Sequence, residues 1–490
     1  MNRAVIRYIS GVVLSIEAIL LLFPALTGLI YHEKAGWFYL ITAVLCIACG
    51  FLLARRKPGS FVFYLKEGCI ATAFSWIFMS IFGALPLWLS GEIPCYTDAL
   101  FEIVSGFTTT GASILSDVEA LSYCNLFWRS FTHWIGGMGV LVFLLAIIPL
   151  SGASSINLMR AESPGPSVGK LVPKLRYTAR ILYLIYLCMT IIQLVLLLAG
   201  GMSFFDAICT SFATAGTGGF GIKNDSLGSY SPYIQWVTAI FMLLFGINFN
   251  AFYLILFHKW KQAFKMEEVR AYILVIMAST GIIFLNILNV FYKTGDALRH
   301  SFFQVTSIIS STGFSTADFD QWPQVSRATL VLIMFIGACA GSTGGGIKVS
   351  RIIILVKAVF KELSSYIHPK IIKKIKIDGK PVEHEIVRSV NAYFITFIIV
   401  FSISVFIVTL EDKDLVTNFT AVVATLNNIG PGLGLAGPAQ NFGHFSMLSK
   451  YILIFDMLAG RLELFPVLIL FHPVVWKDFF SHKKKHKGRA

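Results

Sequence analysis

The sequence predicts an all-α polytopic membrane protein, in which four pseudo-repeated helix–pore-helix–loop–helix units surround one pore after two extra N-terminal transmembrane helices. Three observations lead to this fold class. The chain is 56% hydrophobic and only 13% charged, about half the charge of a typical soluble protein. Ten apolar runs reach or approach the ~20 residues that cross a bilayer. Four short, polar, glycine-rich segments recur between those runs.

The expected spans lie near residues 9–30, 36–54, 66–90, 126–150, 178–200, 232–257, 271–292, 327–360, 388–410 and 447–475. If the chain starts on the inner side, most of its 40 lysines and arginines fall in inner segments. The positive-inside rule therefore places both termini in the cytoplasm. It also explains the net charge of +14, which in a soluble protein would suggest nucleic acid. No nucleic-acid partner is expected.

The start of the chain and its cysteines add little chemistry. Residues 2–31 have a basic start but no small-residue cleavage site, so a signal-anchor helix is expected. The eight cysteines form no CxxC pair, which gives no support to a metal or redox site. Cys95 and Cys124 flank the first glycine-rich segment on the outer side, where they either pair or stay as free thiols.

Each outer loop, at 91–125, 201–231, 293–326 and 411–446, contains an apolar stretch too short to span. Such a stretch between two spans is typical of a re-entrant helix. The backbone can leave the helix at that depth only where it is buried in protein or lines a water-filled cavity. The expected division is two N-terminal transmembrane helices at 1–60, pore units at 61–150, 175–258, 268–365 and 386–475, and a basic tail at 476–490.

The four loops align on one glycine each, namely Gly111, Gly219, Gly313 and Gly430. At equal spacing before these glycines stand Asp98, Asp206, His300 and Thr417. Because Asp and Thr side chains are good helix N-caps, three of the units are expected to share the order cap, short helix and glycine hairpin. In the third unit, Asp296 precedes the histidine by one turn.

These loops suit a cation pore. A dehydrated monovalent cation needs oxygen ligands, and four loops around one axis can supply backbone carbonyls. Carbonyls point inward only if the backbone takes unusual dihedrals, which glycine tolerates, and the C-terminal ends of the short helices add partial negative charge. Threonine hydroxyls are available as well, at Thr110, Thr217 and Thr312. The bland alternative is four ordinary loops, but the matched context of all four favours a pore.

Acids follow three of the four hairpins, at Asp117, Asp225 and Asp318. At an outer mouth they would concentrate cations; as ordinary loop residues they would cap local turns. Both readings stay open at this stage. The fourth unit carries Gly430-Pro431-Gly432 with no acid, so the mouth is not expected to be four-fold symmetric.

The helix expected from residue 327 is interrupted by the run Gly337-Ala338-Cys339-Ala340-Gly341-Ser342-Thr343-Gly344-Gly345-Gly346. Each glycine costs roughly 1 kcal/mol against alanine in a helix, so a straight helix is not expected. A phosphate-binding P-loop would need lysine directly after the last glycine, whereas Ile347 intervenes before Lys348. Close helix packing through small residues explains only part of the run. A broken helix beside a water-filled pore explains the whole of it.

Arg461 lies inside the last span, where a charge is expensive and usually faces a cavity or a partner. A structural ion pair with Glu463 or another acid is the alternative, but Glu463 is only two residues away and lies on a different helix face.

Taken together, the motifs resemble the TrkH branch of the Trk/Ktr/HKT superfamily of potassium transporters. They are Thr108-Thr109-Thr110-Gly111-Ala112, Ser311-Thr312-Gly313-Phe314-Ser315, Gly341-Ser342-Thr343-Gly344-Gly345-Gly346-Ile347-Lys348 and Gly460-Arg461-Leu462-Glu463. The resemblance covers nearly the whole chain, including the two extra N-terminal spans. Gly221 departs from it, since serine is common there.

The resemblance implies a potassium-selective filter formed by Thr109, Thr110, Gly111, Thr217, Gly218, Gly219, Ser311, Thr312, Gly313, Asn428, Ile429 and Gly430. It also implies an intramembrane gate with Gly341, Gly344, Gly345, Gly346, Lys348 and Arg461, the arginine acting as a barrier to cations. Four filter glycines imply potassium over sodium. Potassium is the substrate, and no cofactor is implied for this chain.

The resemblance further implies a homodimer in a bacterial inner membrane, in contact with lipid and with a cytosolic TrkA-type nucleotide-binding subunit. No GxGxxG βαβ unit occurs in this chain, so a nucleotide would bind that partner. A membrane-embedded enzyme would need a clustered catalytic constellation, and none is visible. An alternating-access transporter would show two inverted halves. Potassium symport with protons or sodium remains the alternative function.

Overall fold

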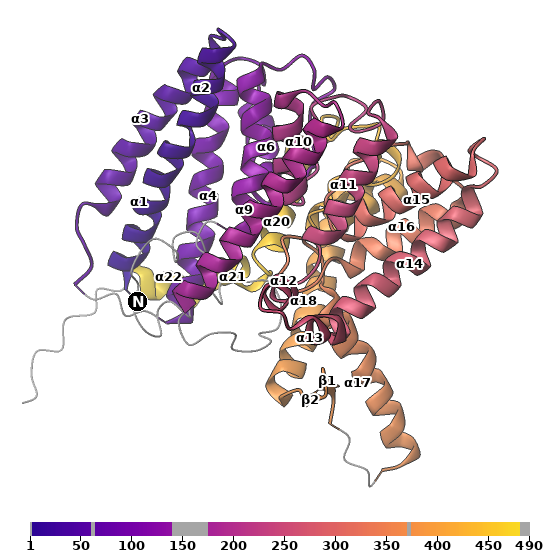
Figure 1. The fold of residues 1–490 in the computed structure, drawn as a ribbon. Coiled ribbons are helices and arrows are strands. Elements are labelled where there is room, and N and C mark those ends of the chain that lie inside the picture. Colours follow the sequence, from indigo (N-terminus) through magenta and orange to yellow (C-terminus); the bar gives the residue numbers. More distant parts are fainter. Residues whose placement is uncertain (1, 60–63, 140–174, 370–373, 481–490) are drawn as a thin grey trace, which may run out of the picture.

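The computed structural model describes residues 2–59, 64–139, 175–369 and 374–480, and these residues are predominantly helical (Figure 1). Among them, the sheet structure consists of one short antiparallel pair, β1 (Lys376–Ile377) and β2 (Lys380–Pro381). Within the described ranges, six helices are long and apolar enough to cross a membrane, or seven if one bent pair counts as a span. The structure thus confirms the predicted all-α polytopic membrane class.

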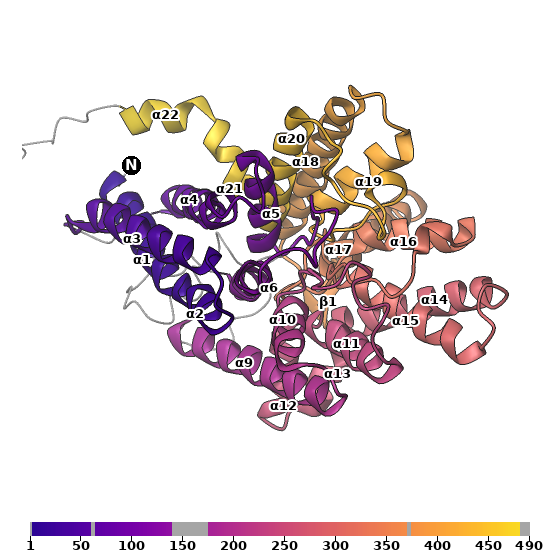
Figure 2. The same ribbon diagram turned by 90° about the horizontal axis from the view of Figure 1, so that it is seen from above.

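The N-terminal helices form a layer on one side of the molecule (Figure 2). Helices α1 (Arg3–Leu20) and α2 (Leu22–Ile30) together make the first span, and α3 (Ala35–Ala54) returns beside them. The backbones approach closely through small residues, because a Cβ on Gly11 would lie 2.7 Å from the Gly50 carbonyl oxygen. Helix α1 also packs on α4, which ties this layer to the rest of the bundle.

The remaining helices follow the order long helix, short helix, loop and inner helix. The first set is α4 (Leu65–Leu89), α5 (Tyr96–Phe107) and α6 (Tyr123–Met138). The second is α9 (Leu175–Ala199), α10 (Phe204–Ala215), α11 (Pro232–Phe245) and α12 (Phe249–Leu256), followed by α13 (Trp260–Lys265).

The third set is α14 (Glu267–Ile287), α15 (Thr294–Ile309), η1 (Phe319–Gln321), α16 (Gln324–Ile336) and α17 (Val349–Ile367). The fourth is α18 (His384–Thr409), α19 (Leu415–Leu426), η2 (Gly434–Ala436), α20 (Met447–Arg461) and α21 (Phe465–Leu468). The described chain ends with η3 (Ile469–Phe471) and α22 (Pro473–Phe480).

The four sets succeed one another around a common centre (Figure 2). The inner helix of each set packs against the short helix of the next: α6 against α10, α11 against α15, α16 against α19, and α20 against α5. The last contact returns to the first set, so the arrangement closes on itself.

The inner helices differ from the expected continuous spans. Helices α11 and α12 meet at a bend of 92°, and α20 ends at Arg461, before Glu463 and Leu464 adopt left-handed φ angles of 63° and 60°. The spans expected at 232–257, 327–360 and 447–475 are therefore broken. The sequence pattern predicted only the break in the span at 327–360, because the spans at 232–257 and 447–475 remain apolar across their breaks. Residues 140–150 of the span expected at 126–150 lie outside the described residues.

The predicted helix caps are also corrected. Asp98, Asp206 and Thr417 stand three residues inside their helices, and the capping positions are Cys95, Ser203 and Asp414. The Ser203 and Asp414 side chains accept from the backbone N–H groups of Asp206 and Thr417, respectively. His300 lies well inside α15, whose first turn contains Asp296. The equal spacing therefore marks the third residue of α5, α10 and α19 and not the cap. An acid at this position also stabilises the helix, because its negative charge lies near the positive end of the helix dipole.

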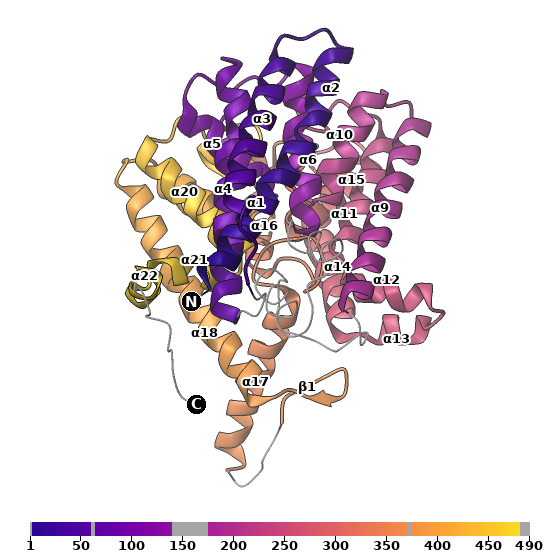
Figure 3. The ribbon, with the colours of Figure 1, turned by 90° about the vertical axis from the view of Figure 1, so that its left-hand side faces the viewer.

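Cys95 and Cys124 are free thiols, so the disulfide that the sequence left open is not formed. The Cys124 thiol lies 3.3 Å from the Ser122 hydroxyl. The start of α1 and helix α22 lie at the same end of the bundle, and α17 and the β1–β2 hairpin project beyond that end (Figure 3). Residues 481–490 of the expected basic tail lie outside the described residues.

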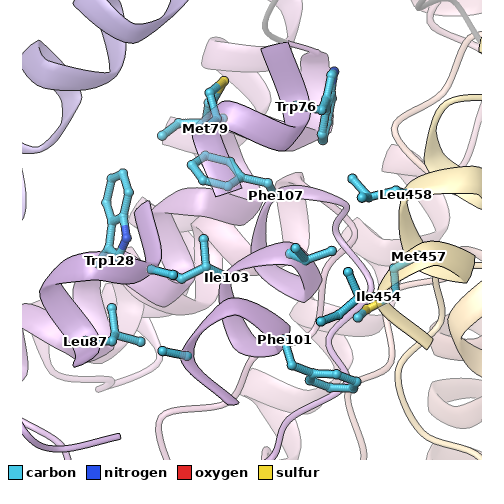
Figure 4. Close-up of a cluster of buried hydrophobic side chains, with 14 of the residues drawn as sticks. Trp76, Met79, Leu87, Phe101, Ile103, Phe107, Trp128, Ile454, Met457 and Leu458 are labelled. Atoms are coloured by element: carbon cyan, nitrogen blue, oxygen red, sulfur yellow. The ribbon is translucent and has the colours of Figure 1, made fainter. Parts of the chain in front are cut away.

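The largest buried apolar cluster joins the N-terminal layer to the first and fourth sets. Figure 4 shows its central part, in which Trp76 and Met79 of α4 face Phe107 of α5, and Met457 of α20 closes the cluster. The Trp128 indole donates to the Gly83 carbonyl at 3.0 Å, as a buried tryptophan requires. This core fixes the end of α5, from which the first glycine loop begins.

Candidate ion pathway

All four short helices end in one backbone motif. The N–H groups of Thr110, Gly218, Thr312 and Ile429 each donate to a carbonyl five residues earlier at 2.8 Å. The residues just before them, Thr109, Thr217, Ser311 and Asn428, have left-handed φ angles of 53° to 57°. This is a Schellman motif, in which glycine usually takes the left-handed position. Four non-glycine residues in that conformation are a repeated strain typical of functional sites.

The four glycines expected to lead the filter form a closed ring. A Cβ on Gly111 would lie 2.0 Å from the Gly218 carbonyl oxygen, and one on Gly219 would lie 1.9 Å from that of Thr312. The same relation continues from Gly313 to Ile429 at 2.1 Å and from Gly430 to Thr110 at 2.7 Å. All four glycines have φ between 80° and 97°. Each ring glycine thus lies against the carbonyl oxygen of a residue in the neighbouring loop, namely the residue that directly precedes that loop's own ring glycine.

The side chains of Thr110, Thr217 and Thr312 are buried beside the ring, and their hydroxyls are already bonded. Thr110 Oγ1 lies 2.8 Å from Thr108 Oγ1 and accepts from the Asn428 amide at 3.0 Å. Thr217 donates to the Gly216 carbonyl at 2.6 Å, and Thr312 shares a bond with Ser310 at 2.7 Å. These three hydroxyls brace the loops. The oxygens that remain available to an ion are the backbone carbonyls and the Thr109 hydroxyl, which has no hydrogen-bond partner among the described residues.

His133 of α6 braces the first two loops from behind. The Gly106 carbonyl lies 2.8 Å from its Nδ1, and the Phe220 backbone N–H donates to its Nε2 at 3.2 Å. Both bonds are satisfied by a neutral imidazole with its proton on Nδ1. The ring fills the space beside Gly218, where a Cβ would lie 2.2 Å from the imidazole. The sequence analysis did not single out His133. It could have been found there, because an ionisable residue within an expected span is a candidate functional residue.

A buried ion pair supports the first loop. The Arg129 guanidinium lies 2.7 Å from the Glu102 carboxylate, and both side chains are almost fully buried. Glu102 also accepts from the Ser113 hydroxyl and the Ile114 N–H at about 3.0 Å. The arginine in turn lies over the Phe220 ring at 4.1 Å. The pair therefore holds the outer end of the first loop against the second loop. The sequence analysis did not identify this ion pair.

A cavity of about 130 Å³ lies above the ring and is lined by all four glycines together with Arg129 and Lys223. Asp117, Asp225 and Asp318 are not among its lining residues. Asp117 instead accepts from the Asn224 amide at 2.8 Å, and Asp318 caps η1. Asp225 accepts from Ser229 at 3.3 Å. The loop-capping interpretation of these acids is the one that the structure supports.

The glycine run between α16 and α17 lies directly against the ring. A Cβ on Gly344 would lie 2.6 Å from the Ser310 carbonyl, and one on Gly345 would lie 2.4 Å from that of Asn427. The Gly345 N–H also donates to the Ser311 hydroxyl. Gly341 and Gly346 have φ angles of 68° and 80°. Helix α16 precedes the run, so the strand that a P-loop requires is absent from this described segment.

Two charged side chains hold this intramembrane loop. Glu268 of α14 is buried and accepts from the Ala340 N–H at 2.6 Å and the Ser350 N–H at 3.2 Å. Its carboxylate thus joins the loop to the start of α17. The ammonium of Lys348, which is also buried, donates to the Gly344 carbonyl. Lys348 was expected at the gate, whereas Glu268 was overlooked although an acid at the start of a span is a visible signal.

Arg461 connects three parts of the molecule below the ring. Its guanidinium donates to the Thr343 carbonyl at 2.8 Å, to the Gly137 carbonyl at 2.9 Å, and to that of Gly136. Glu463, the suggested partner, instead pairs with Arg351. Glu463 is therefore not the partner of Arg461. The arginine lies between the first set, the fourth set and the intramembrane loop, within reach of the centre.

These features define a polytopic membrane protein with a central re-entrant region, in which four glycine loops close a ring against a broken inner helix. The comparisons agree with this class. A family model described as "TrkH: Cation transport protein" matches residues 38–483. The chain belongs to the TrkH family, which is a family of transporters and not of enzymes.

Similar proteins match along their whole length. "Trk system potassium uptake protein TrkH" of Salmonella typhimurium is 37% identical over 97% of this chain and 99% of its own. The Escherichia coli protein of the same description shows the same values. A solved structure, "Crystal Structure of the Potassium Transporter TrkH from Vibrio parahaemolyticus", is 33% identical, covers 97% of this chain and 100% of its own, and superposes with a TM-score of 0.87.

Proposed function

We propose that this chain is a potassium-uptake subunit that conducts the ion through one pore built from its four helix sets. The closed ring of Gly111, Gly219, Gly313 and Gly430 carries the proposal. Each glycine lies against a carbonyl of the next loop, which brings four equivalent carbonyls around one axis as a dehydrated cation requires. The relatives are described as potassium uptake proteins, and four glycines favour potassium over sodium.

The filter in this proposal consists of Thr109, Thr110, Gly111, Thr217, Gly218, Gly219, Ser311, Thr312, Gly313, Asn428, Ile429 and Gly430. The left-handed residue and the following positive-φ glycine alternate in each loop. Such an alternation turns successive carbonyls in a way that extended backbone does not. Potassium is the transported substrate, and the ion would exchange its hydration shell for carbonyl oxygens in this ring.

The gate in this proposal is the loop containing Gly341, Gly344, Gly345 and Gly346, closed by Lys348 and Arg461. Contact of Gly344 and Gly345 with the filter loops supports this position. The Arg461 guanidinium adds a positive charge below the filter, which opposes a passing cation. Opening requires the loop to leave the filter and the arginine to release the Thr343 carbonyl.

We place the protein in a bacterial inner membrane with both termini cytoplasmic. The start of α1 and helix α22 share one end of the bundle (Figure 3), and the basic segments flanking the spans support that end as the inner one. Helix α17 projects from it and joins the gate loop to the cytoplasm. A TrkA-type nucleotide-binding subunit acting on this projection, and a homodimer of this chain, complete the proposal.

Symport with protons is a second candidate, favoured by two buried carboxyl groups. Both carboxyl oxygens of Glu17 and one of Asp456 have no hydrogen-bond partner among the described residues, and both side chains are fully buried. An isolated carboxylate is costly in such surroundings, so a proton on either group would be retained and could be exchanged. A pore and a proton site are compatible in one chain.

Rubidium flux into proteoliposomes tests both candidates. A selective pore predicts rubidium uptake driven by membrane potential, with sodium a poor competitor and no dependence on a pH gradient. Proton symport predicts that an inwardly directed proton gradient drives uptake at zero membrane potential. Equal competition by sodium would contradict the assignment to potassium. So would absence of rubidium uptake by folded protein both with the intramembrane loop intact and with residues 338–345 deleted.

A further inference from the structure

A groove that shares no lining residue with the cavity above the ring opens at the start of the chain. It has a volume of about 510 Å³ and is lined by Arg3, Ala4, Ile6, Arg7, Ser10, Leu53, Phe74 and Phe78. Helices α1, α3 and α4, which supply these residues, form the peripheral layer that faces the viewer in Figure 3. The volume falls within the range of about 300–1,000 Å³ that holds small organic ligands.

The groove has one polar edge and apolar walls. Arg3, Arg7 and Ser10 are spaced by four and three residues, so they lie along one face of α1. Opposite them, Phe74 and Phe78 stack with ring centres 5.9 Å apart and rings 16° from parallel. Leu53 at the end of α3 completes the apolar side. Such a division matches an amphipathic ligand with a polar head and a hydrocarbon chain.

Two buried polar atoms on the α1 edge lack a partner among the described residues. They are the Ser10 hydroxyl, in a side chain that is only 2% exposed, and the Arg7 Nε. Buried donors of this kind are normally satisfied. Arg7 uses its Nη2 to hold the Arg56 carbonyl at 3.1 Å, which brings the basic turn of residues 55–57 beside the groove. Both residues line the groove, so acceptor oxygens of a ligand placed there would lie beside these two donors.

From these observations we infer that the groove binds an anionic phospholipid, with its phosphate on Arg3, Arg7 and Ser10 and an acyl chain against Phe74 and Phe78. Positive charge selects an anionic head over a zwitterionic one, and the forked guanidinium geometry suits phosphate oxygens. The apolar walls exclude free phosphate as the main ligand, because they would gain nothing from it. The inference goes beyond ion transport and does not depend on which ion passes.

Native mass spectrometry of the purified full-length chain tests this site, with phosphatidylglycerol and phosphatidylcholine of equal chain length as probes. Wild-type protein should bind phosphatidylglycerol at least tenfold more tightly, since each arginine near an anionic head contributes about fivefold. The double variant Arg3→Gln/Arg7→Gln should lose that preference. Arg55→Gln/Lys57→Gln, which removes the same charge outside the groove lining, should keep it.

A third variant, Ser10→Leu, keeps the charge but removes the hydroxyl and fills the groove, so its affinity for phosphatidylglycerol should also fall. Elution as a single folded species and an unchanged melting temperature establish that each variant is intact. The inference is overturned if the Arg3→Gln/Arg7→Gln variant retains the preference, or if both double variants lose it equally, which would indicate general surface charge. Displacement of the lipid by inorganic phosphate would likewise overturn it.

Discussion

Gly111 of the first loop lies so close to Gly218 of the second that a Cβ on Gly111 would stand 2.0 Å from the Gly218 carbonyl oxygen. No side chain fits there without moving a backbone oxygen of the ring. The separation between the two loops is thus set by the absence of a side chain, and the same relation recurs at each junction of the ring.

The first prediction is that Gly111→Ser weakens discrimination against sodium. The hydroxymethyl group must displace the Gly218 carbonyl, and the φ of 80° adds backbone strain. We expect the rubidium-to-sodium permeability ratio to fall by about tenfold, which corresponds to about 1.4 kcal/mol. Gly91→Ser is the matched control, because Gly91 has a φ of 79° but open space around its Cβ position. An unchanged ratio in Gly111→Ser would sink the filter assignment.

The second prediction concerns deletion of residues 338–345. Gly337 and Gly346 are already in contact, since a Cβ on Gly337 would lie 2.9 Å from the Gly346 Cα. The ends can therefore be joined with little movement of α16 or α17. We expect rubidium flux without any partner subunit to rise several-fold, because the obstacle below the ring is removed. Loss of flux, or flux equal to wild type in a monodisperse preparation, would count against the gate.

The third prediction separates the charge of Arg461 from its hydrogen bonds. Arg461→Gln removes both and should raise flux, since the barrier to cations disappears. Arg461→Lys keeps the charge but loses the fork that reaches Thr343 and Gly137. Low flux in Arg461→Lys would show that the charge closes the pore, whereas high flux in both variants would assign closure to the bonds. If neither variant changes flux, Arg461 has no place in the gate.

The fourth prediction is that Glu268→Gln loosens the intramembrane loop. The carboxylate accepts from two backbone N–H groups, and each hydrogen bond to a charged group contributes about 1.5–3 kcal/mol. An amide can replace only part of this, so flux in the absence of a partner should increase about two- to tenfold and the melting temperature should drop. Glu267→Gln is the control, because that neighbour pairs with Lys357 away from the loop. Equal effects of both variants would refute a specific latch.

Much of the site was visible in the sequence because it depends on residue type. The ring glycines align by spacing alone, and the run from Gly337 to Gly346 excludes a straight helix. Arg461 was singled out because a charge is expensive within a membrane, and Lys348 because it stands at the end of the glycine run. His133, Glu102 and Arg129 escaped notice because their role is defined by contacts with loops that lie up to 92 residues away along the chain.

The sequence by itself determined the membrane class, the number of glycine loops and their order, since apolar length and local conformational preference are properties of short segments. Tertiary structure alone decided that the loops close into a ring, that α11 and α20 end at mid-span, and that Glu463 pairs with Arg351 instead of Arg461. It also bonded Asp225 and Asp318 within their own loops and Asp117 to Asn224 of the second loop. These outcomes depend on which backbones meet across the bundle, and packing between distant segments leaves no periodic trace in the chain.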